Sequence, residues 1–422
     1  MPSVSHGLRR RAPRLALYAA CGIESMSYGA VYALLAQLQK HYGLPTWGLG
    51  TIAGATFAAQ LVAQLTVARY ADRGRCRRML QLGVVMAALG ILGFGASSHL
   101  WQFIASRALL GFGSGTFIPA ALRVVVAEAG DDTGQALGRL MSVQVGGFVV
   151  GPPVGALLYS LFGLRVPFFA QAVLLALCLP LLRMVVEPPV VAAHAAKGAI
   201  RRLVALRPAR AALALAAGTF VTMGAFEATW ARFLTDRGAT SVTIAISVSL
   251  FALPLVFLAP AGGRLADRAG PLRAAIVSLL LLGALQSLYA IPVPYWFAFV
   301  FSVGQSLVIA VCLPAGQAAM AAASPEDLVG AGQGLYGATG AAMAAVASVG
   351  AASVYGSLGP SAMWLMVGVA TASGGLLARG LTGPLRRGAP GAAPVVADAL
   401  APAEALLLVS GPAETPAPAE GD

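Results

Sequence analysis

The sequence predicts an all-α integral membrane protein with twelve transmembrane helices arranged as two bundles of six. Three observations predict this fold: the composition, the number of long apolar segments, and the placement of arginine between them. Of the 422 residues, 58% are hydrophobic and 10% are charged, and the mean hydropathy is +0.79. A soluble globular chain is closer to half apolar and a quarter charged. The composition is therefore that of a chain embedded in a lipid bilayer.

Apolar segments long enough to cross the hydrocarbon core as helices, about 20 residues each, recur along the chain. In the first half they cover residues 15–38, 47–68, 79–98, 100–124, 138–162 and 166–186. In the second half they cover residues 211–234, 241–263, 272–291, 295–322, 332–357 and 360–381. We therefore expect a cytoplasmic flank (1–13), a first bundle (14–186), a polar central loop (187–210), a second bundle (211–381) and a disordered Pro/Ala-rich cytoplasmic tail (382–422).

Arginine falls in alternate loops. Arginines cluster before the first segment, after the second, in the central loop, and after the eighth and twelfth, whereas the opposite loops hold only Lys40, Arg165, Arg232 and Arg237. An excess of Lys and Arg marks cytoplasmic loops, so both termini are expected in the cytoplasm. The net charge of +12 then reports topology rather than affinity for nucleic acid. Arginine in place of lysine, with abundant Ala and Gly, points to a bacterial inner-membrane protein.

The sequence contains few of the residue patterns that enzymes use for catalysis. The four cysteines stand far apart without CxxC spacing, and the four histidines lie in flanks and loops. No GxSxG, HExxH or Walker loop occurs. We therefore expect no catalytic site, no metal and no bound cofactor.

The two halves resemble each other in sequence. Residues 68–78 (ARYADRGRCRR) align with 263–273 (GRLADRAGPLR), 195 residues later, and Pro119 aligns with Pro314 at the same offset. Residues 134–163 align with 330–359 at an offset of 196. Duplicated six-helix halves are typical of transporters whose site lies at the interface of the halves.

The loop motifs carry a specific resemblance. Residues 263–270 (GRLADRAG) resemble the G-x-L-a-D-R-x-G loop of the major facilitator superfamily, and residues 107–113 (RALLGFG) are similar to its R-x-x-x-G-x-G segment. The first copy of the loop departs from the motif, with Arg75 in place of the second Gly. The resemblance implies that these loops gate the cytoplasmic side, with an acid meeting a helix N-terminus of the other half and Arg123 as a further partner for Asp72. The expected gating residues are Asp72, Arg73, Arg77, Arg123, Gly263, Asp267, Arg268 and Gly270. The alternative is that they only cap helices and set topology.

Residues 141–158 (MSVQVGGFVVGPPVGALL) resemble the antiporter motif of the same superfamily. Gly138, Gly147, Gly151, Pro152 and Gly155 match the motif in register, and Ala156 replaces its last Gly. The resemblance implies efflux by antiport. Physically, three glycines on one helix face let a partner helix approach closely, and Pro152 bends the helix. The alternative is ordinary packing of small residues.

Three ionisable residues fall well inside the predicted spans: Glu24, Arg107 and Glu227. Charged groups are costly in a bilayer and mark functional sites by default. Spacing along the helices places Glu24 and Arg107 near mid-depth and Glu227 toward the outer leaflet. The resemblance implies that the spans of Glu24 and Arg107 face one central cavity. We expect Glu24 to carry a proton that Arg107 tunes, the alternative being a static ion pair.

Glu227 is expected either to contact a cationic or polar substrate or to snorkel outward. Further polar side chains are candidates for lining the same cavity. They are Tyr28, Tyr32, Gln60, Gln64, Gln144, Gln286 and Gln305. The alternative for these residues is packing and hydrogen bonding between helices.

These observations predict a secondary transporter that works by alternating access, a proton-coupled antiporter exporting a small organic or drug-like compound. The proton gradient is the expected energy source, and the expected partners are the substrate, protons and the lipid bilayer, with the protein as a monomer and without nucleic acid. Two alternatives remain open. One is a symporter or uniporter that imports a metabolite, and the other is a transport-inactive receptor or regulator on the same scaffold.

Overall fold

The computed structural model describes residues 3–67, 70, 74–129, 133–188, 198–292, 294–325 and 328–382. Side chains are described for these residues except 3–14, 129, 133–138, 256, 259, 260 and 267. Within these ranges the secondary structure is helical, with no strand. The helices of the first half are α1 (Ser3–Tyr42), α2 (Thr46–Thr66), α3 (Cys76–Ala96), α4 (Leu100–Ala129), α5 (Thr133–Phe162) and α6 (Val166–Leu182).

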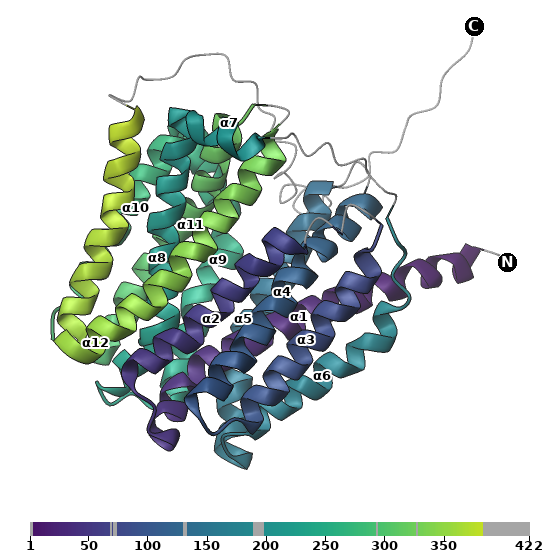
Figure 1. Cartoon of the computed structure of the whole chain (residues 1–422), viewed down its shortest axis with the longest axis horizontal. Coiled ribbons are helices and arrows are strands. Elements are labelled where there is room, and N and C mark those ends of the chain that lie inside the picture. The colour runs from purple at the N-terminus through teal and green to yellow at the C-terminus, as the bar shows by residue number, and fades with distance from the viewer. Residues whose placement is uncertain are drawn as a thin grey trace, which may run out of the picture.

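The second half contains α8 (Arg207–Thr235), α9 (Ser241–Ala269), α10 (Pro271–Leu288), α11 (Tyr295–Ala323) and α12 (Val329–Thr382). The last of these is a pair of helices joined at Gly359, whose φ of 85° interrupts the helix before Pro360. A positive φ suits glycine because it has no Cβ. The two arms of α12 fold back from this point (Figure 1).

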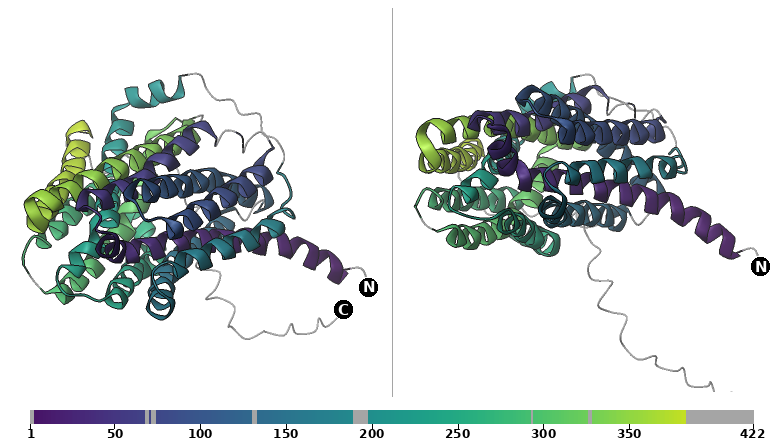
Figure 2. Two further views of the ribbon diagram at one scale, coloured as in Figure 1. Left: turned by 60° about the horizontal axis from the view of Figure 1, so that its bottom comes forward. Right: turned by 90° about the horizontal axis from the view of Figure 1, so that it is seen from below.

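Every apolar segment predicted from the sequence is helical, and the differences lie at the ends. The helix α1 begins at Ser3, so the predicted flank continues the helix beyond its neighbours (Figure 2). The helix α9 runs on through the predicted loop to Ala269. The predicted central loop contains a short helix, α7 (Ala199–Ala205). Polar turns added to a helix end do not change hydropathy over the span, which explains why hydropathy does not reveal these extensions.

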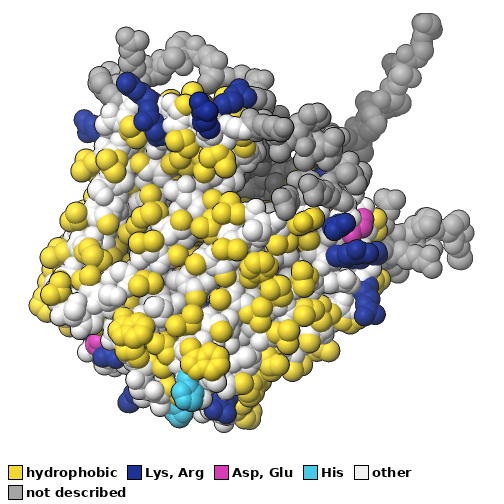
Figure 3. All heavy atoms as spheres, viewed as in Figure 1, with side chains coloured by type: hydrophobic (Ala, Val, Ile, Leu, Met, Phe, Trp, Pro, Cys, Tyr) yellow, Lys and Arg dark blue, Asp and Glu magenta, His cyan; other side chains and the backbone are white. Residues whose placement is uncertain are grey.

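Eight helices of the described chain are long and apolar enough to cross a membrane by length and composition: α2, α3, α4, α5, α8, α10, α11 and α12. The helix α6 and residues 241–255 of α9 are apolar but shorter. Hydrophobic side chains cover the middle of the face seen in Figure 3, and Lys and Arg side chains gather toward its margins. This is the surface of a helical membrane protein.

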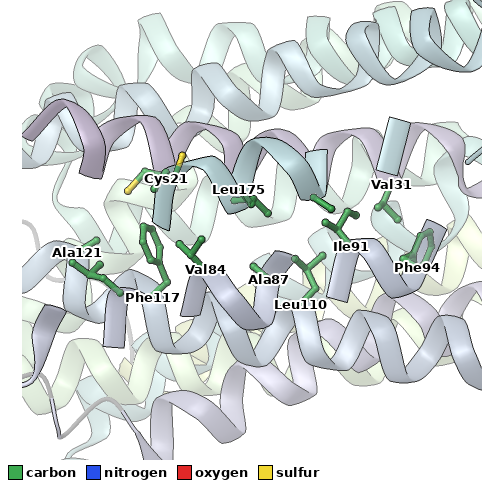
Figure 4. Close-up of a cluster of buried hydrophobic side chains, with 14 of the residues drawn as sticks. Cys21, Val31, Val84, Ala87, Ile91, Phe94, Leu110, Phe117, Ala121 and Leu175 are labelled. Carbon is green, nitrogen blue, oxygen red and sulfur yellow. The ribbon is translucent and has the colours of Figure 1, made fainter. Parts of the chain in front are cut away.

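Each half has its own buried core. In the first, side chains from α1, α3, α4 and α6 interdigitate, among them Cys21, Phe94, Phe117 and Leu175 (Figure 4). In the second, a cluster from α8, α10 and α11 includes Leu215, Leu279 and Ile309. Between these cores the helices α1, α2 and α5 meet α8, α9 and α12.

Close backbone contacts recur at the repeat offset. A Cβ on Gly29 would lie 2.6 Å from the carbonyl oxygen of Phe148, and one on Gly224, 195 residues later, would overlap the carbonyl of Ala344. Both glycines let two helices of one half approach closely. The predicted similarity of the halves therefore extends to their backbone packing.

One end of the molecule carries the short connections 43–45, 97–99, 163–165, 236–240 and 289–294, and we call it the short-loop end. The opposite end carries the starts of α3, α7 and α8, and we call it the arginine-rich end because of the arginines there: Arg75, Arg77, Arg78, Arg201, Arg202, Arg207 and Arg210.

Candidate functional site

The helix α1 has two faces with different contents. Residues two apart on an α-helix point about 200° from each other. Glu24, Tyr28 and Tyr32 lie one turn apart on one face, whereas Gly22, Met26 and Ala30 form the opposite face. The same helix can therefore pack closely on one side and hold polar groups on the other.

The glycines of the predicted antiporter motif pack on the smooth face of α1. A Cβ on Gly147 would overlap the carbonyl of Gly22, and one on Gly151 would overlap that of Met26. A Cβ on Gly155 would lie 2.9 Å from the Ala30 Cβ. The three contacts advance by four residues on both helices, so α1 and α5 run in close contact over two turns. Gly138 lies in α5, outside the residues with described side chains.

Two prolines inside α5 release two backbone carbonyls. Proline lacks the N–H that bonds the carbonyl four residues earlier, so Pro152 frees the Phe148 carbonyl and Pro153 frees that of Val149. The Phe148 oxygen points at Gly29 of α1, where a side chain would collide with it. The kinked segment is therefore fitted to its neighbours, as a broken helix in a bilayer must be.

The polar face of α1 faces a buried cluster. Glu24 is 2% exposed, and Ser114 of α4 lies beside both the Glu24 carboxyl and the Tyr28 hydroxyl. The Arg107 guanidinium carbon lies 5.3 Å from the centre of the Tyr28 ring. Sequence reasoning missed Ser114, although it follows Arg107 by two helical turns and so shares its face.

Arg107 forms an ion pair with Glu227 of α8, and the pair joins the two halves. Arg107 is 1% exposed, and the Glu227 side chain is 16% exposed. Tyr32 lies near the Glu227 carboxylate. We call Glu24, Tyr28, Arg107, Ser114 and Glu227 the central polar cluster.

The ion pair gives Arg107 and Glu227 a partner that the sequence analysis did not foresee. We expected Arg107 to act on Glu24, but its carboxylate partner is Glu227. We also expected Glu227 to meet substrate or snorkel outward, whereas its carboxylate is tied to Arg107. The signal was present in the sequence, because Arg107 lies seven residues from the start of α4 and Glu227 eight residues from the end of α8. The start of α4 and the end of α8 both lie at the short-loop end, so the two residues are at equal depth.

Several atoms of this cluster have unused hydrogen-bonding capacity. Among the described side chains, Glu24 Oε1, Tyr28 Oη, and Arg107 Nε and Nη1 are buried without a hydrogen-bond partner. Orphaned buried polar groups are rare and call for an explanation in terms of strain, chemistry or an absent ligand. The Glu24 carboxyl has no cation paired with it, so a bound proton is the simplest way to balance its charge.

The glutamines expected to line a cavity divide into two groups. Gln60, Gln64 and Gln144 are half-buried on α2 and α5. Gln286 and Gln305 are fully buried, and they hydrogen-bond to Thr222 (2.8 Å) and Tyr289 (3.1 Å) within the second half. For these two the alternative of interhelical bonding fits the structure.

The short-loop end holds a second cross-half network that sequence reasoning missed. Arg232 of α8 donates to Gln39 Oε1 of α1 at 2.8 Å and to Asp236 Oδ2 at 2.9 Å. Tyr355 of α12 donates to the same Asp236 oxygen at 2.8 Å. Together with the contact of Gly50 against Ser348, this network closes the two halves onto each other at that end.

The loop motifs are only partly described. Asp72 and Arg73 lie outside the described residues, as does the side chain of Asp267. Gly263 and Arg268 lie in the last turns of α9, Arg123 is half-buried on α4, and the Arg77 backbone N–H donates to Glu187 Oε1 at 3.1 Å.

The motif glycine has a clear backbone role. Gly270 ends α9 with a φ of 86°. In the first copy Gly74, one position earlier, takes a φ of 68°, which explains how Arg75 can replace the second Gly.

Within the described residues no group of three or more His, Cys, Asp or Glu side chains could hold a metal ion. The arrangement instead offers a carboxyl group that can bind a proton, an ion pair across the interface of the halves, and close-packed helices on either side.

Comparison with known proteins gives a family, relatives and folds. The model of the Major Facilitator Superfamily matches residues 17–240 and 211–413. Multidrug resistance protein MdtG of Dickeya zeae (strain Ech586) is 30% identical over 312 residues, which cover 70% of this chain and 72% of that protein. MdtG of Enterobacter lignolyticus (strain SCF1) is 31% identical over 256 residues, covering 57% and 61%.

Two solved structures share the fold. The nucleoside transporter NupG matches with a TM-score of 0.74 at 13% identity, over 88% of this chain and 99% of that one. A bacterial homologue of the human lysosomal transporter Spinster, in an inward-facing state, matches with a TM-score of 0.69 at 16% identity, over 88% and 94%. At these identities the likeness concerns the fold alone.

Proposed function

Because the chain belongs to the major facilitator superfamily, and is thus a secondary transporter of small molecules rather than an enzyme, we propose that it is a proton-coupled antiporter that exports a drug-like organic compound across the bacterial inner membrane. The family match covers most of the chain, and the helices are those of a multi-pass membrane protein. Such an antiporter needs a defined orientation in the membrane, a group that carries the proton, and side chains that contact the substrate.

The proposed architecture is twelve spans in two six-helix bundles with both termini in the cytoplasm. The helix α12 supplies two spans because Gly359 divides it, and α7 lies outside the membrane. With this count the arginine-rich end faces the cytoplasm. The cross-half contacts at the short-loop end then close the outer side, as expected for an inward-facing state of an alternating-access cycle.

Glu24 is the proposed proton site. This rests on one observation above all: its carboxyl is buried with an oxygen that has no partner, while the neighbouring Arg107 is neutralised by Glu227. The Glu227 carboxylate already balances the Arg107 charge, so we assign the proton to Glu24, the carboxyl without a paired cation. Loss of the Glu24 proton places a second negative charge near Arg107 and disturbs the pair that joins the halves.

The substrate proposal rests on the relatives and on the fifth predicted span. The relatives are named multidrug resistance proteins, and α5 carries the five residues that resemble the antiporter motif. Half-buried polar groups from Gln60, Gln64 and Gln144 are proposed to contact the compound. The protein is proposed to act as a monomer, driven by the proton gradient without a metal or other cofactor.

The test uses purified protein in liposomes with an imposed pH gradient. We expect uptake of a lipophilic dye or antibiotic to follow the gradient, and Glu24→Gln to abolish that dependence. Gln286→Asn serves as a matched control, because it changes a buried polar side chain of the second half that takes no part in the proposed proton site. Gradient-independent movement in the wild type would refute antiport and favour a uniporter, and co-directional movement of proton and substrate would favour a symporter. Absence of flux for every compound tested would favour a transport-inactive receptor or regulator.

A further inference from the structure

The second proline of α5 creates a hydrogen-bond acceptor at the interface of the two halves. Pro153 has no N–H for the Val149 carbonyl, which lies four residues earlier. The Ser249 hydroxyl of α9, in the other half, donates to that carbonyl oxygen at 2.6 Å. A backbone acceptor released by a proline in one half is therefore satisfied by a side chain of the other.

Small residues bring the two helices close enough for this bond. Ala156 of α5, Ala245 of α9 and Ala33 of α1 form a fully buried cluster beside it. Ala245 lies one turn before Ser249 on the same helix. The Ser249 hydroxyl thus reaches the Val149 backbone directly, in a segment where apolar surroundings make an unpaired carbonyl costly.

The corresponding interface of the other repeat lacks this arrangement. The residue 195 positions before Ser249 is Gly54 of α2, and those 196 positions after Val149 and Pro153 are Ala345 and Val349 of α12. A Cβ on Gly54 would lie 2.9 Å from the Ala345 carbonyl oxygen, so the same backbones meet there. Gly54 has no hydroxyl, and Val349 keeps the N–H that bonds Ala345 within the helix. The cross-half bond is therefore specific to the α5–α9 side.

We propose that Ser249 is a positioning residue whose bond to the Val149 carbonyl holds the short-loop end of the two halves closed. The proposal rests on the proposed alternating-access transport, because it concerns the balance between the two states. When the halves rock apart at this end, Ser249 and Val149 separate and the freed carbonyl has no helical N–H to return to. Because Pro153 cannot bond the Val149 carbonyl within α5, that carbonyl is bonded only in the state in which the short-loop end is closed.

The test measures the distance between the halves directly. Spin labels are placed at His99 in the first half and Pro292 in the second, two exposed positions at the short-loop end, and their distance distribution is recorded in detergent without substrate. The native cysteines of the described chain are buried, which limits background labelling. Ser249→Ala is expected to lower the ratio of short to long distances about fivefold, the effect of one typical hydrogen bond. Ser249→Thr, which keeps the hydroxyl, is expected to retain the wild-type ratio.

Pro153 provides a control that separates the proposed role of Ser249 from a merely structural one. In a Pro153→Ala background residue 153 regains its N–H, so Ser249→Ala is expected to change the ratio by less than half as much. Ser353→Ala on α12, whose hydroxyl bonds only within its own helix, is expected to have no effect. An unchanged ratio in Ser249→Ala, or an equal change in both backgrounds, would overturn the proposal. Neither result depends on proton coupling, so this experiment and the liposome test of antiport can fail independently of each other.

Discussion

At the scale of single residues, the balance of buried charge separates Glu24 from Arg107 and Glu227. Arg107 and Glu227 neutralise each other across the interface of the halves, whereas the side chains beside the Glu24 carboxyl, Ser114 and Tyr28, are neutral, and no ion pair to it occurs among the described residues. A buried pair is destabilising to break because its remaining member is left uncompensated. A carboxylate that binds a proton becomes neutral, and it then needs no counter-ion. The three residues should therefore respond differently to neutral substitution.

Glu227→Gln is expected to lower the free energy of unfolding by about 3–5 kcal/mol, because it leaves the Arg107 guanidinium buried without its counter-ion. The double variant Arg107→Gln, Glu227→Gln is expected to regain most of this loss. Unfolding in mixed detergent micelles measures both. Glu24→Gln is the matched control and should change stability by less than about 1 kcal/mol, and equal losses for Glu24→Gln and Glu227→Gln would contradict this assignment.

At the scale of helices, glycine decides how closely neighbours approach. The contacts of Gly147, Gly151 and Gly155 with α1 leave no room for a side chain, while Gly146, the neighbour of Gly147, has no other atom within 4 Å of a Cβ. The glycines of α5 therefore serve different purposes although they look alike in sequence. Only the face that meets α1 requires them.

Gly151→Ala is expected to destabilise the protein by about 1–3 kcal/mol, because its Cβ would overlap the Met26 carbonyl and force α1 and α5 apart. Gly146→Ala is expected to be neutral or slightly stabilising, since alanine favours the helix. Thermal unfolding in detergent compares the two. A similar melting temperature for both variants would show that close α1–α5 packing is not what the glycines provide.

The two glycines of the second loop motif also differ. Gly270 holds a φ of 86° between α9 and α10, whereas Gly263 is helical with open space around it. Gly270→Ala should cost about 1–2 kcal/mol in backbone strain, and Gly263→Ala should cost nothing. Thermal unfolding in detergent compares the two variants. A larger loss of stability for Gly263→Ala would indicate that another helix packs against Gly263 in another state.

At the scale of the whole molecule, hydropathy and arginine placement were sufficient to locate every apolar segment as a helix, but not the start of α1, the end of α9 or the short helix α7. They could not show which way each helix is turned about its axis. That rotation decides that Arg107 meets Glu227 and that Gln286 and Gln305 bond inside one half. Depth along a helix is readable once its ends are known: the sequence places Glu227 nearer the outer leaflet than Arg107, whereas the observed bounds of α4 and α8 place the two residues level. The contacts of Gln39 and Ser249 depend on how the halves dock, which leaves no local pattern in the sequence.

The sidedness of the molecule is a further whole-molecule prediction. A cysteine at His99, on the short-loop end, is expected to react with a membrane-impermeant maleimide in intact cells. A cysteine at Ile200, which is 59% exposed on α7, is expected to react only in inverted vesicles. Labelling of position 200 from outside would reverse the proposed orientation, and with it the state assigned to the closed end.

The central claim is that Glu24 exchanges a proton for substrate, and the most direct measurement is proton release on substrate binding. Purified protein in weakly buffered detergent solution is titrated with a transported compound while a pH indicator is followed. The wild type is expected to release protons, Glu24→Gln to release none, and Gly146→Ala to behave as the wild type. Undiminished release from Glu24→Gln would contradict the claim and move the proton to another group.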